Sequence, residues 1–175
     1  RFNSLKSVIL EDGVEIVSTQ AFMSCDSLTE INMPESVITI NEGAFAYCYG
    51  LNAITIPSKV GMLQGKTFHM CKNLKSITVM NSMVVEASIS DFEYVDKEEC
   101  IIYVPEALVD YYKYATGWRD FAHILPIGSA GIKQISNSKT FNVYDLLGRK
   151  VLTNVTSLDN LPKGLYVING KKVLK

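Results

Sequence analysis

Apolar and cysteine residues recur along this chain with a period of 23 residues. The clearest markers of the repeat are Leu5, Leu28, Leu51 and Leu74, then Phe22, Phe45 and Phe68, then Cys25, Cys48 and Cys71. A fixed period of this length is typical of solenoids, in which each repeat forms one coil and neighbouring coils stack. The period constrains the architecture strongly and the function weakly, because solenoids of one fold bind unrelated partners.

Each repeat predicts two short extended segments and a tight turn. In one copy Ile54 and Ile56 stand on either side of Thr55, which places both isoleucines on one face of a strand that Pro57 ends. The three-residue spacing from Phe45 to Cys48 suggests one turn of helix or 3₁₀ helix. Because a single coil cannot bury its own apolar edge, we expect equivalent residues to stack, with strands about 4.8 Å apart.

The repeat resembles that of the BspA-like leucine-rich repeat family of bacterial surface proteins, whose coils follow the pattern Leu-x-x-Ile-x-Ile-Pro-x-x-Val-x-x-Ile-x-x-x-Ala-Phe-x-x-Cys. Residues 28–48 match it closely, and residues 5–25 and 51–71 match it recognisably. The fourth copy loses the period after Met83 and recovers only a shifted Phe92, as a capping coil does. The resemblance implies a right-handed, β-rich leucine-rich repeat solenoid over residues 1–127, with coils at about 4–26, 27–49, 50–72 and 73–104.

A capping helix is expected over residues 105–117, because Pro105 suits a first helical position and Gly117 suits the stop. Its apolar face is predicted to consist of Leu108, Tyr111, Tyr112 and Ala115. Trp118 and Phe121 should fill the lower edge of the open solenoid end. The alternative is an aromatic platform for sugar, although capping the core accounts for every aromatic residue of this segment except Tyr114.

After Ile127 the sequence changes character. Residues 128–139 are expected to form a flexible linker, and residues 140–175 alternate as the short strands of a small all-β module. The module resembles the C-terminal sorting domain of type IX secretion, and the matching residues are Tyr144, Asp145, Gly148, Arg149, Gly164, Tyr166, Gly170, Lys171 and Lys172. The resemblance implies the export machinery as a partner and a location at the bacterial cell surface or outside the cell. The lysines have a second explanation, as charges that keep an edge strand from pairing with other chains.

Composition and motifs exclude several classes of function. The chain has 175 residues and a formal charge of −1, without a basic run that would attract nucleic acid. No apolar stretch approaches the ~20 residues that cross a bilayer. The two histidines are not accompanied by a nucleophile motif, and the chain has no glycine loop that would bind a phosphate or a dinucleotide. The sequence therefore predicts a non-enzymatic protein that needs no cofactor.

Arg1 already stands inside a repeat, so we expect further residues upstream of it.

The cysteines allow two interpretations. Cys25, Cys48 and Cys71 share one inward position of the repeat, where a small buried side chain is needed, and this favours free thiols. Successive coils would bring them close enough for a disulfide, but parallel side chains aim the sulfurs poorly. A metal site is not expected, since His69 and Cys71 have no further ligands near them in the sequence.

Two surfaces remain as candidates for ligand binding. The outward residues of the first strands should form columns on a sheet face, and the candidates there are Glu30, Asn32, Thr55, Ser76 and Thr78. The turns between the phenylalanines and the cysteines give a second patch, formed by Tyr47, Tyr49, His69 and Lys72.

The resemblance to the BspA-like family implies that the chain binds a macromolecular ligand, a protein or a glycan, on host or neighbouring cells. One alternative is a structural spacer or docking module for an activity in upstream residues, and another is a carbohydrate-active enzyme. The polar columns also have a plainer explanation, as the solvated surface of a sheet.

Overall fold

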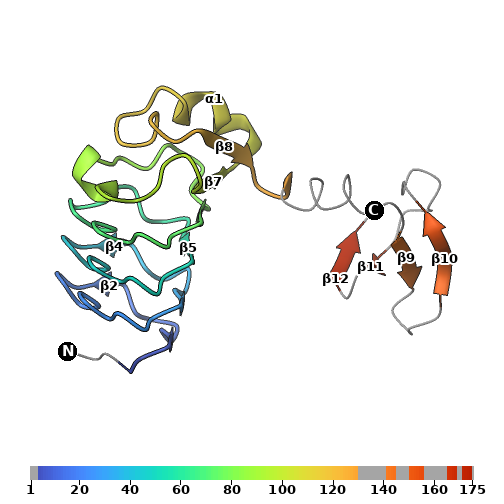
Figure 1. Ribbon diagram of the computed structural model, residues 1–175, viewed down its shortest axis with the longest axis horizontal. Coiled ribbons are helices and arrows are strands. Elements are labelled where there is room, and N and C mark those ends of the chain that lie inside the picture. The colour runs from blue at the N-terminus through green and yellow to red at the C-terminus, as the bar shows by residue number, and fades with distance from the viewer. Residues whose placement is uncertain (1–3, 130–140, 145–149, 156–164, 169–170, 175) are drawn as a thin grey trace. The chain divides into compact units, whose positions relative to one another are not determined.

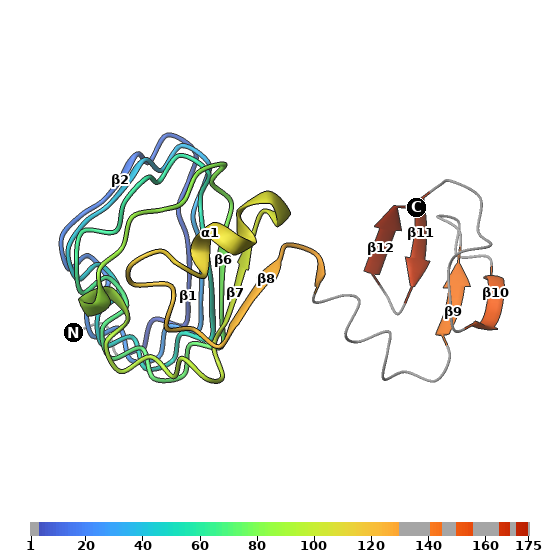
Figure 2. The same ribbon diagram turned by 90° about the horizontal axis from the view of Figure 1, so that it is seen from above.

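The computed structural model describes residues 4–129 and, in the rest of the chain, the backbone of strands at residues 141–144, 150–155, 165–168 and 171–174. The chain separates into two compact units, Arg1–Ile127 and Gly128–Lys175. The first unit is a stack of coils, which Figure 1 shows from the side and Figure 2 shows along the stack. The predicted leucine-rich repeat solenoid is confirmed.

One strand from each coil lies on the same side of the first unit. In chain order these strands are β1 (Ser7–Ile9), β3 (Glu30–Asn32), β5 (Ala53–Ile56), β6 (Ser76–Val79), β7 (Ile101–Val104) and β8 (His123–Pro126). They pair in parallel as two sheets, β1-β3 and β5-β6-β7-β8, so no ladder joins the neighbouring strands β3 and β5. Burial alternates along β5 as predicted, since Ile54 and Ile56 are buried while Ala53 and Thr55 are exposed.

A second, shorter set of strands lies on the opposite side of the coils (Figure 1). It consists of β2 (Ile16–Val17) and β4 (Thr39–Ile40), which pair in parallel, and Ile40 continues the set through a bridge to Leu63. These pairings keep the period of 23 residues. The first strands leave that period later in the chain, where Ser76 pairs with Ile101 and Ile101 pairs with His123. The sequence did not predict β8, because its residues no longer follow the repeat.

Hydrogen bonds between the turns hold the coils in register. In the second coil, the N–H groups that donate to a carbonyl of the next coil, at 2.8–3.0 Å, belong to Gly43, Phe45 and Tyr47. The N–H groups between them donate to the carbonyl three residues earlier and belong to Ala44, Ala46 and Cys48. A 3₁₀ helix requires consecutive bonds of the second kind. The segment therefore forms hydrogen-bonded turns and not the expected helical turn. Half of these N–H groups donate to carbonyls of the neighbouring coil.

Phenylalanine rings stack inside these turns. Phe22, Phe45, Phe68 and Phe92 follow one another with ring centroids 5.6–6.0 Å apart and planes within 14° of parallel. Phe92 thus keeps its place in the stack, although its spacing from Phe68 departs from the period. Trp118 covers the end of the stack, with its centroid 4.7 Å from that of Phe92 and its ring tilted by 54°.

The capping segment is confirmed in position but is less helical than expected. The 3₁₀ helix η2 (Glu106–Leu108) leads into α1 (Val109–Tyr112), and turns follow instead of a helix that extends to residue 117. Tyr112 and Trp118 are buried, and both bind Val85: its N–H donates to Tyr112 Oη at 2.9 Å, and its carbonyl accepts from Trp118 Nε1 at 2.7 Å. The predicted apolar face is wrong at Tyr111, which is 66% exposed, because a single helical turn cannot direct two adjacent residues into the same core.

The second unit contains a four-stranded antiparallel sheet. Its strands are β9 (Phe141–Tyr144), β10 (Lys150–Val155), β11 (Leu165–Ile168) and β12 (Lys171–Leu174), in the order β10-β9-β11-β12. Of the residues that match the sorting domain, Tyr144, Tyr166, Lys171 and Lys172 lie on these strands, of which only the backbone is described. The others lie outside the described residues, and they are Asp145, Gly148, Arg149, Gly164 and Gly170. A sorting role for this unit stays a prediction.

Candidate binding surfaces

A hollow of about 420 Å³ lies on the outward face of the first strands. Four of the five residues predicted for this face line it, namely Glu30, Asn32, Thr55 and Thr78. Ser76 lies on β6, paired with Ala53 and Ile101, and does not line the hollow. The structure therefore brings most of the predicted column residues together in one place.

The hollow coincides with the break between the two sheets. It is lined from both sides of the break, by residues of β1 and β3 and by residues of β5 and β6. Ile9, an apolar residue that is 77% exposed, also lines it, so apolar surface contributes to the hollow beside the polar residues. An apolar surface with a few polar groups around it is the usual composition of a ligand site.

The turns carry a second candidate surface, which is a column of aromatic rings. The ring of His69 lies between Tyr47 and Tyr94, with centroid distances of 5.2 and 5.5 Å and edge-to-face geometry in both pairs. Tyr49 contacts Tyr47 in the same manner, with the centroids 6.4 Å apart. We call Tyr47, His69 and Tyr94 the turn ridge. The predicted candidates Tyr47, Tyr49 and His69 are thus neighbours.

Two hollows adjoin the turn ridge. The first, of about 280 Å³, is lined by Gln20, Met23, Glu42, Gly43, Ala46, Tyr47, Lys66, His69 and Glu93. The second, of about 340 Å³, is lined by Met23, Ser24, Asp26, Tyr47 and Tyr49. Lys72, the fourth residue predicted for this patch, is exposed and lines neither hollow. The sequence missed Glu93 and Tyr94, because one extra residue shifts the fourth coil, and a comparison that allowed a period of 24 there would have found them.

The backbone of the turns is unusual at two residues of the ridge, Tyr47 and Tyr94, and at Met70, the neighbour of His69. Tyr47, Met70 and Tyr94 occupy equivalent positions of successive coils, and all have positive φ angles of 61–66°. Residues other than glycine rarely adopt this left-handed conformation. Here the bonds to the next coil hold it in place, since Tyr47 N–H donates to His69 O at 2.8 Å and Met70 N–H donates to Glu93 O at 2.9 Å.

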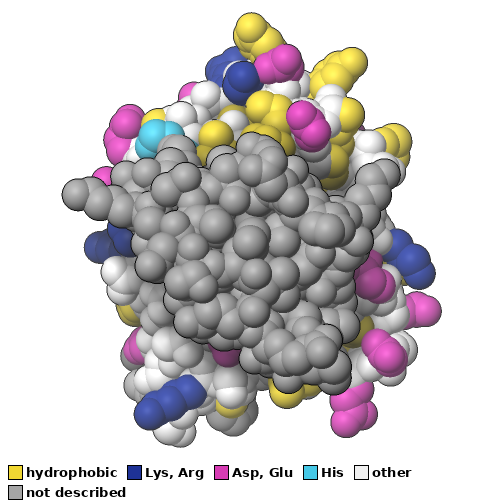
Figure 3. Space-filling model, turned by 90° about the vertical axis from the view of Figure 1, so that its right-hand side faces the viewer, with side chains coloured by type: hydrophobic (Ala, Val, Ile, Leu, Met, Phe, Trp, Pro, Cys, Tyr) yellow, Lys and Arg dark blue, Asp and Glu magenta, His cyan; other side chains and the backbone are white. Residues whose placement is uncertain are grey.

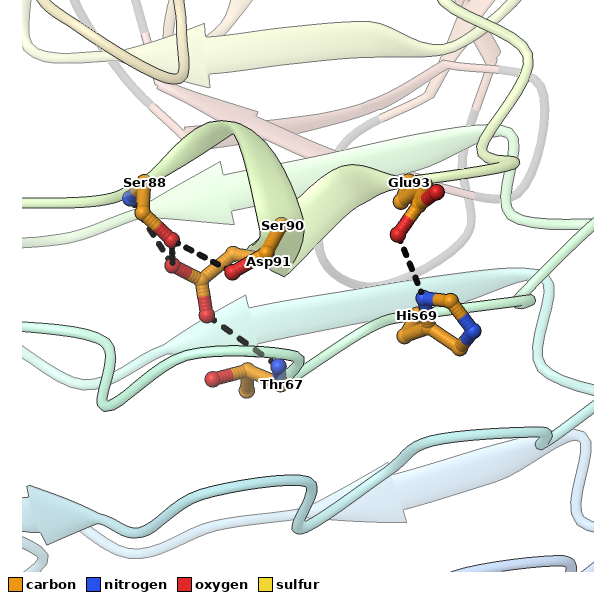
Figure 4. Close-up of polar contacts among 6 residues, drawn as sticks. All are labelled: Thr67, His69, Ser88, Ser90, Asp91 and Glu93. Atoms are coloured by element: carbon orange, nitrogen blue, oxygen red, sulfur yellow. Dashed lines mark hydrogen bonds and ion pairs between the residues drawn. The ribbon is translucent and has the colours of Figure 1, made fainter.

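A buried carboxylate joins the third coil to the fourth beneath this surface. Asp91 is fully buried, and Figure 4 shows it between Ser88 and Thr67. Its Oδ1 accepts from the N–H groups of Gly65 and Thr67 at 3.0 and 3.1 Å, and its Oδ2 accepts from Ser88 N–H and Ser88 Oγ at 2.8 Å. With four donors, the carboxylate has a structural role as the link between these two coils.

The four cysteines are free and buried, as the sequence favoured. The thiol of Cys48 donates to Phe22 O at 3.0 Å, and that of Cys71 donates to Phe45 O at 3.1 Å, so each bonds to the preceding coil. Burial raises the pKa of Cys48 and of Cys100 to about 12, and it raises the pKa of Cys71 as well. Neutral buried thiols are poor nucleophiles and poor metal ligands.

The aromatic residues of the capping segment do not form one platform. Tyr112 and Trp118 belong to the core, whereas Tyr111 and Tyr114 are exposed. Figure 3 shows hydrophobic side chains, with acidic ones among them, over the end of this unit that carries α1. The sugar platform proposed as an alternative would therefore lack two of its four rings.

The part of the chain that the structure describes has neither a metal-ion site nor a membrane-spanning helix. No group of three or more His, Cys, Asp or Glu side chains there is arranged to hold a metal ion. Within the same residues, no helix has the length and apolar character to cross a bilayer.

Comparison with known proteins assigns the repeats. A family model described as BspA type leucine rich repeat region (6 copies) matches residues 1–109. The chain belongs to this family. A solved leucine-rich repeat protein from Bacteroides ovatus ATCC 8483 is similar to this BspA-type chain, with 28% identity, a TM-score of 0.56, and coverage of 71% of this chain and 31% of its own.

A leucine rich cell surface protein from Faecalibacterium prausnitzii A2-165 also matches, with 21% identity, a TM-score of 0.35, and coverage of 73% of this chain and 34% of its own. This BspA-type chain thus spans about a third of the length of the two solved structures. A search of curated proteins found no match. The repeat family and the neighbour from Bacteroides ovatus fit a general binding role without catalysis.

Proposed function

We propose that this protein is exported and binds a protein or glycan of host or neighbouring cells through the outward face of its first strands. The observation that carries the proposal is the hollow over β1, β3 and β5, where polar side chains surround a break in the sheet. Glu30, Asn32 and Thr55 are exposed there, and they offer both donors and acceptors of hydrogen bonds. Membership of the BspA-type family supports a place at the cell surface.

The rigidity of the face supports its use as a binding surface. The residues on the inner side of the same strands are buried, with exposed fractions of 6% at Ile31, 3% at Ile54 and 0% at Ile77. Because the backbone of a packed strand is already ordered, binding costs little further backbone entropy. The shallow form of the surface suits a macromolecule that covers several coils.

An immobilised-ligand screen tests the proposal. The chain would be passed over matrix proteins, serum proteins and surface glycans, beside a triple variant, Glu30→Arg, Thr55→Arg and Thr78→Arg. A control variant makes the same change of formal charge at exposed positions away from this face, with Glu15→Arg, Ser82→Arg and Thr116→Arg.

Saturable binding that the first variant loses and the control keeps, with both folds intact by circular dichroism, supports the strand face. Loss of binding in both variants would show that the added positive charge alone prevents binding, and this result counts against the strand face as the binding site. Absence of binding to every ligand refutes an adhesive role for these repeats and favours a structural spacer.

A further inference from the structure

Two residues of the turn ridge, Tyr47 and His69, line the first hollow together with carboxylates, whereas Tyr94 packs against His69 and lines neither hollow. Tyr94 is 59% exposed, and the side chain of His69 keeps 14% of its surface accessible. Two carboxylates, those of Glu42 and Glu93, line the first hollow, and Asp26 lines the hollow on the other side of Tyr47. These features belong to the turns and are separate from the strand face.

The polar groups of this hollow are incompletely paired. Glu93 Oε2 lies 3.3 Å from His69 Nδ1, the contact drawn in Figure 4. The two atoms lack the alignment of a hydrogen bond, so the buried Nδ1 has no hydrogen-bond partner among the described residues. The Glu93 side chain keeps 49% of its surface exposed, so its carboxylate can accept hydrogen bonds from a ligand in the hollow.

The charges around the turn ridge favour a cation. Among the described residues that line either hollow, Lys66 is the one lysine or arginine, against the carboxylates of Asp26, Glu42 and Glu93. Aromatic rings attract cations through the negative potential of their faces, and nearby carboxylates add charge-assisted hydrogen bonds. An anionic ligand would meet three like charges.

We propose that the turn ridge binds a guanidinium or ammonium group presented by a basic segment of a protein partner. The cation lies in the hollow of about 280 Å³, against the rings of Tyr47 and His69, and pairs with Glu93 and Glu42. The hydrogen bond from Tyr47 N–H to His69 O, at 2.8 Å, joins the two coils that carry these rings and keeps the rings side by side before binding. The proposal does not depend on the strand face, because it concerns different residues.

A nuclear magnetic resonance titration of the full chain with N-acetyl-arginine amide tests whether the turn ridge binds a guanidinium group. Saturable shifts should be confined to the backbone amides of residues 20–26, 42–49, 66–70 and 93–94. The matched neutral probe is N-acetyl-citrulline amide, which has the same shape without the charge and should bind about tenfold more weakly. Equal binding of both probes, or no saturable shift with arginine, overturns the proposal.

Three variants locate the site. Tyr47→Asn removes the ring but keeps a residue that tolerates the left-handed conformation, and it should weaken arginine binding about tenfold. Glu93→Gln should weaken binding about threefold. Lys66→Gln should strengthen it about twofold, because a repelling charge is lost, and glutamine already stands at the equivalent position of the first coil, Gln20.

The control is Tyr114→Asn, which removes an exposed tyrosine of the capping segment and should leave the affinity unchanged. The opposite signs for Glu93→Gln and Lys66→Gln separate site binding from a loss of fold, since unfolding would weaken binding in every variant. Weakening in Tyr114→Asn as large as in Tyr47→Asn overturns the proposal.

Discussion

The substitution Asp91→Asn should destabilise the solenoid more than its conservative chemistry suggests. The carboxylate is fully buried and accepts from Gly65 N–H and Thr67 N–H on one oxygen and from Ser88 N–H and Ser88 Oγ on the other. An asparagine side chain keeps one oxygen as an acceptor, but its NH₂ group meets the donors that faced the second oxygen.

The magnitude follows from these contacts. Hydrogen bonds to a charged group contribute about 1.5–3 kcal/mol each, neutral ones about 0.5–1.5, and a buried donor left unpaired costs about 1–3 kcal/mol. The Ser88 hydroxyl can rotate to accept from the amide, so the loss is that of one paired N–H and of the charge assistance on the others. We expect the free energy of unfolding to fall by about 2–4 kcal/mol.

The assay is urea unfolding followed by circular dichroism, with Asp96→Asn as the control. Asp96 is exposed, and its Oδ1 accepts from the N–H groups of Glu98 and Glu99 at 3.1 and 3.2 Å. An amide oxygen preserves both bonds, so the control should lose less than about 1 kcal/mol. If the two variants are equally stable, the relief of desolvation at Asp91 offsets its hydrogen bonds, and the reasoning is wrong.

Two further predictions concern the close packing of the coils. A Cβ atom at Gly50 would lie 2.8 Å from Asp26 O and 2.9 Å from Leu28 O, so Gly50→Ala should lower the free energy of unfolding by about 1–3 kcal/mol. Gly61 has open space around it, so Gly61→Ala should be neutral or slightly stabilising. Thermal unfolding of the two variants measures the difference. Burial raises the pKa of Cys48 from its ordinary value of 9.0 to about 12, so the neutral thiol contributes stability that is complete below pH 9 and is lost between about pH 9 and 12. Unfolding midpoints from pH 8 to 11 should therefore fall less steeply in Cys48→Ala than in the parent chain, and parallel slopes would contradict this.

The regular part of the solenoid could be predicted because each coil repeats the same environment. Ile54 and Ile77 pair in the sheet, and Phe45 and Phe68 stack, because residues 23 apart occupy the same place on successive coils. The repeat therefore predicts the packing of the core, because each core residue contacts the equivalent residue of the next coil. The free cysteines followed from the same argument.

The irregular part could not be predicted from the period. Phe92 stays in the ring stack, and Ile101 and Ile124 continue the sheet, although none keeps the spacing of 23. The extra residues lie in loops whose arrangement depends on contacts such as those of Asp91. These contacts have no equivalent in the other coils, so the repeat does not predict them. The contacts of the capping segment are of the same kind. Tyr112 and Trp118 both bind Val85, which lies far from them in the sequence, and the period does not predict these contacts.

The candidate surfaces show the same division. The sequence by itself determined which residues share a column, because alternation along a strand and the period together define both faces, and so Glu30, Asn32, Thr55 and Thr78 were identified together. Only the tertiary structure decided that the sheet breaks between β3 and β5 and forms a hollow there, that Tyr94 completes the turn ridge, and that Glu93 lines the hollow beside it. The physical reason is that a period describes what identical coils do alike, whereas a hollow or a cluster arises where neighbouring coils differ.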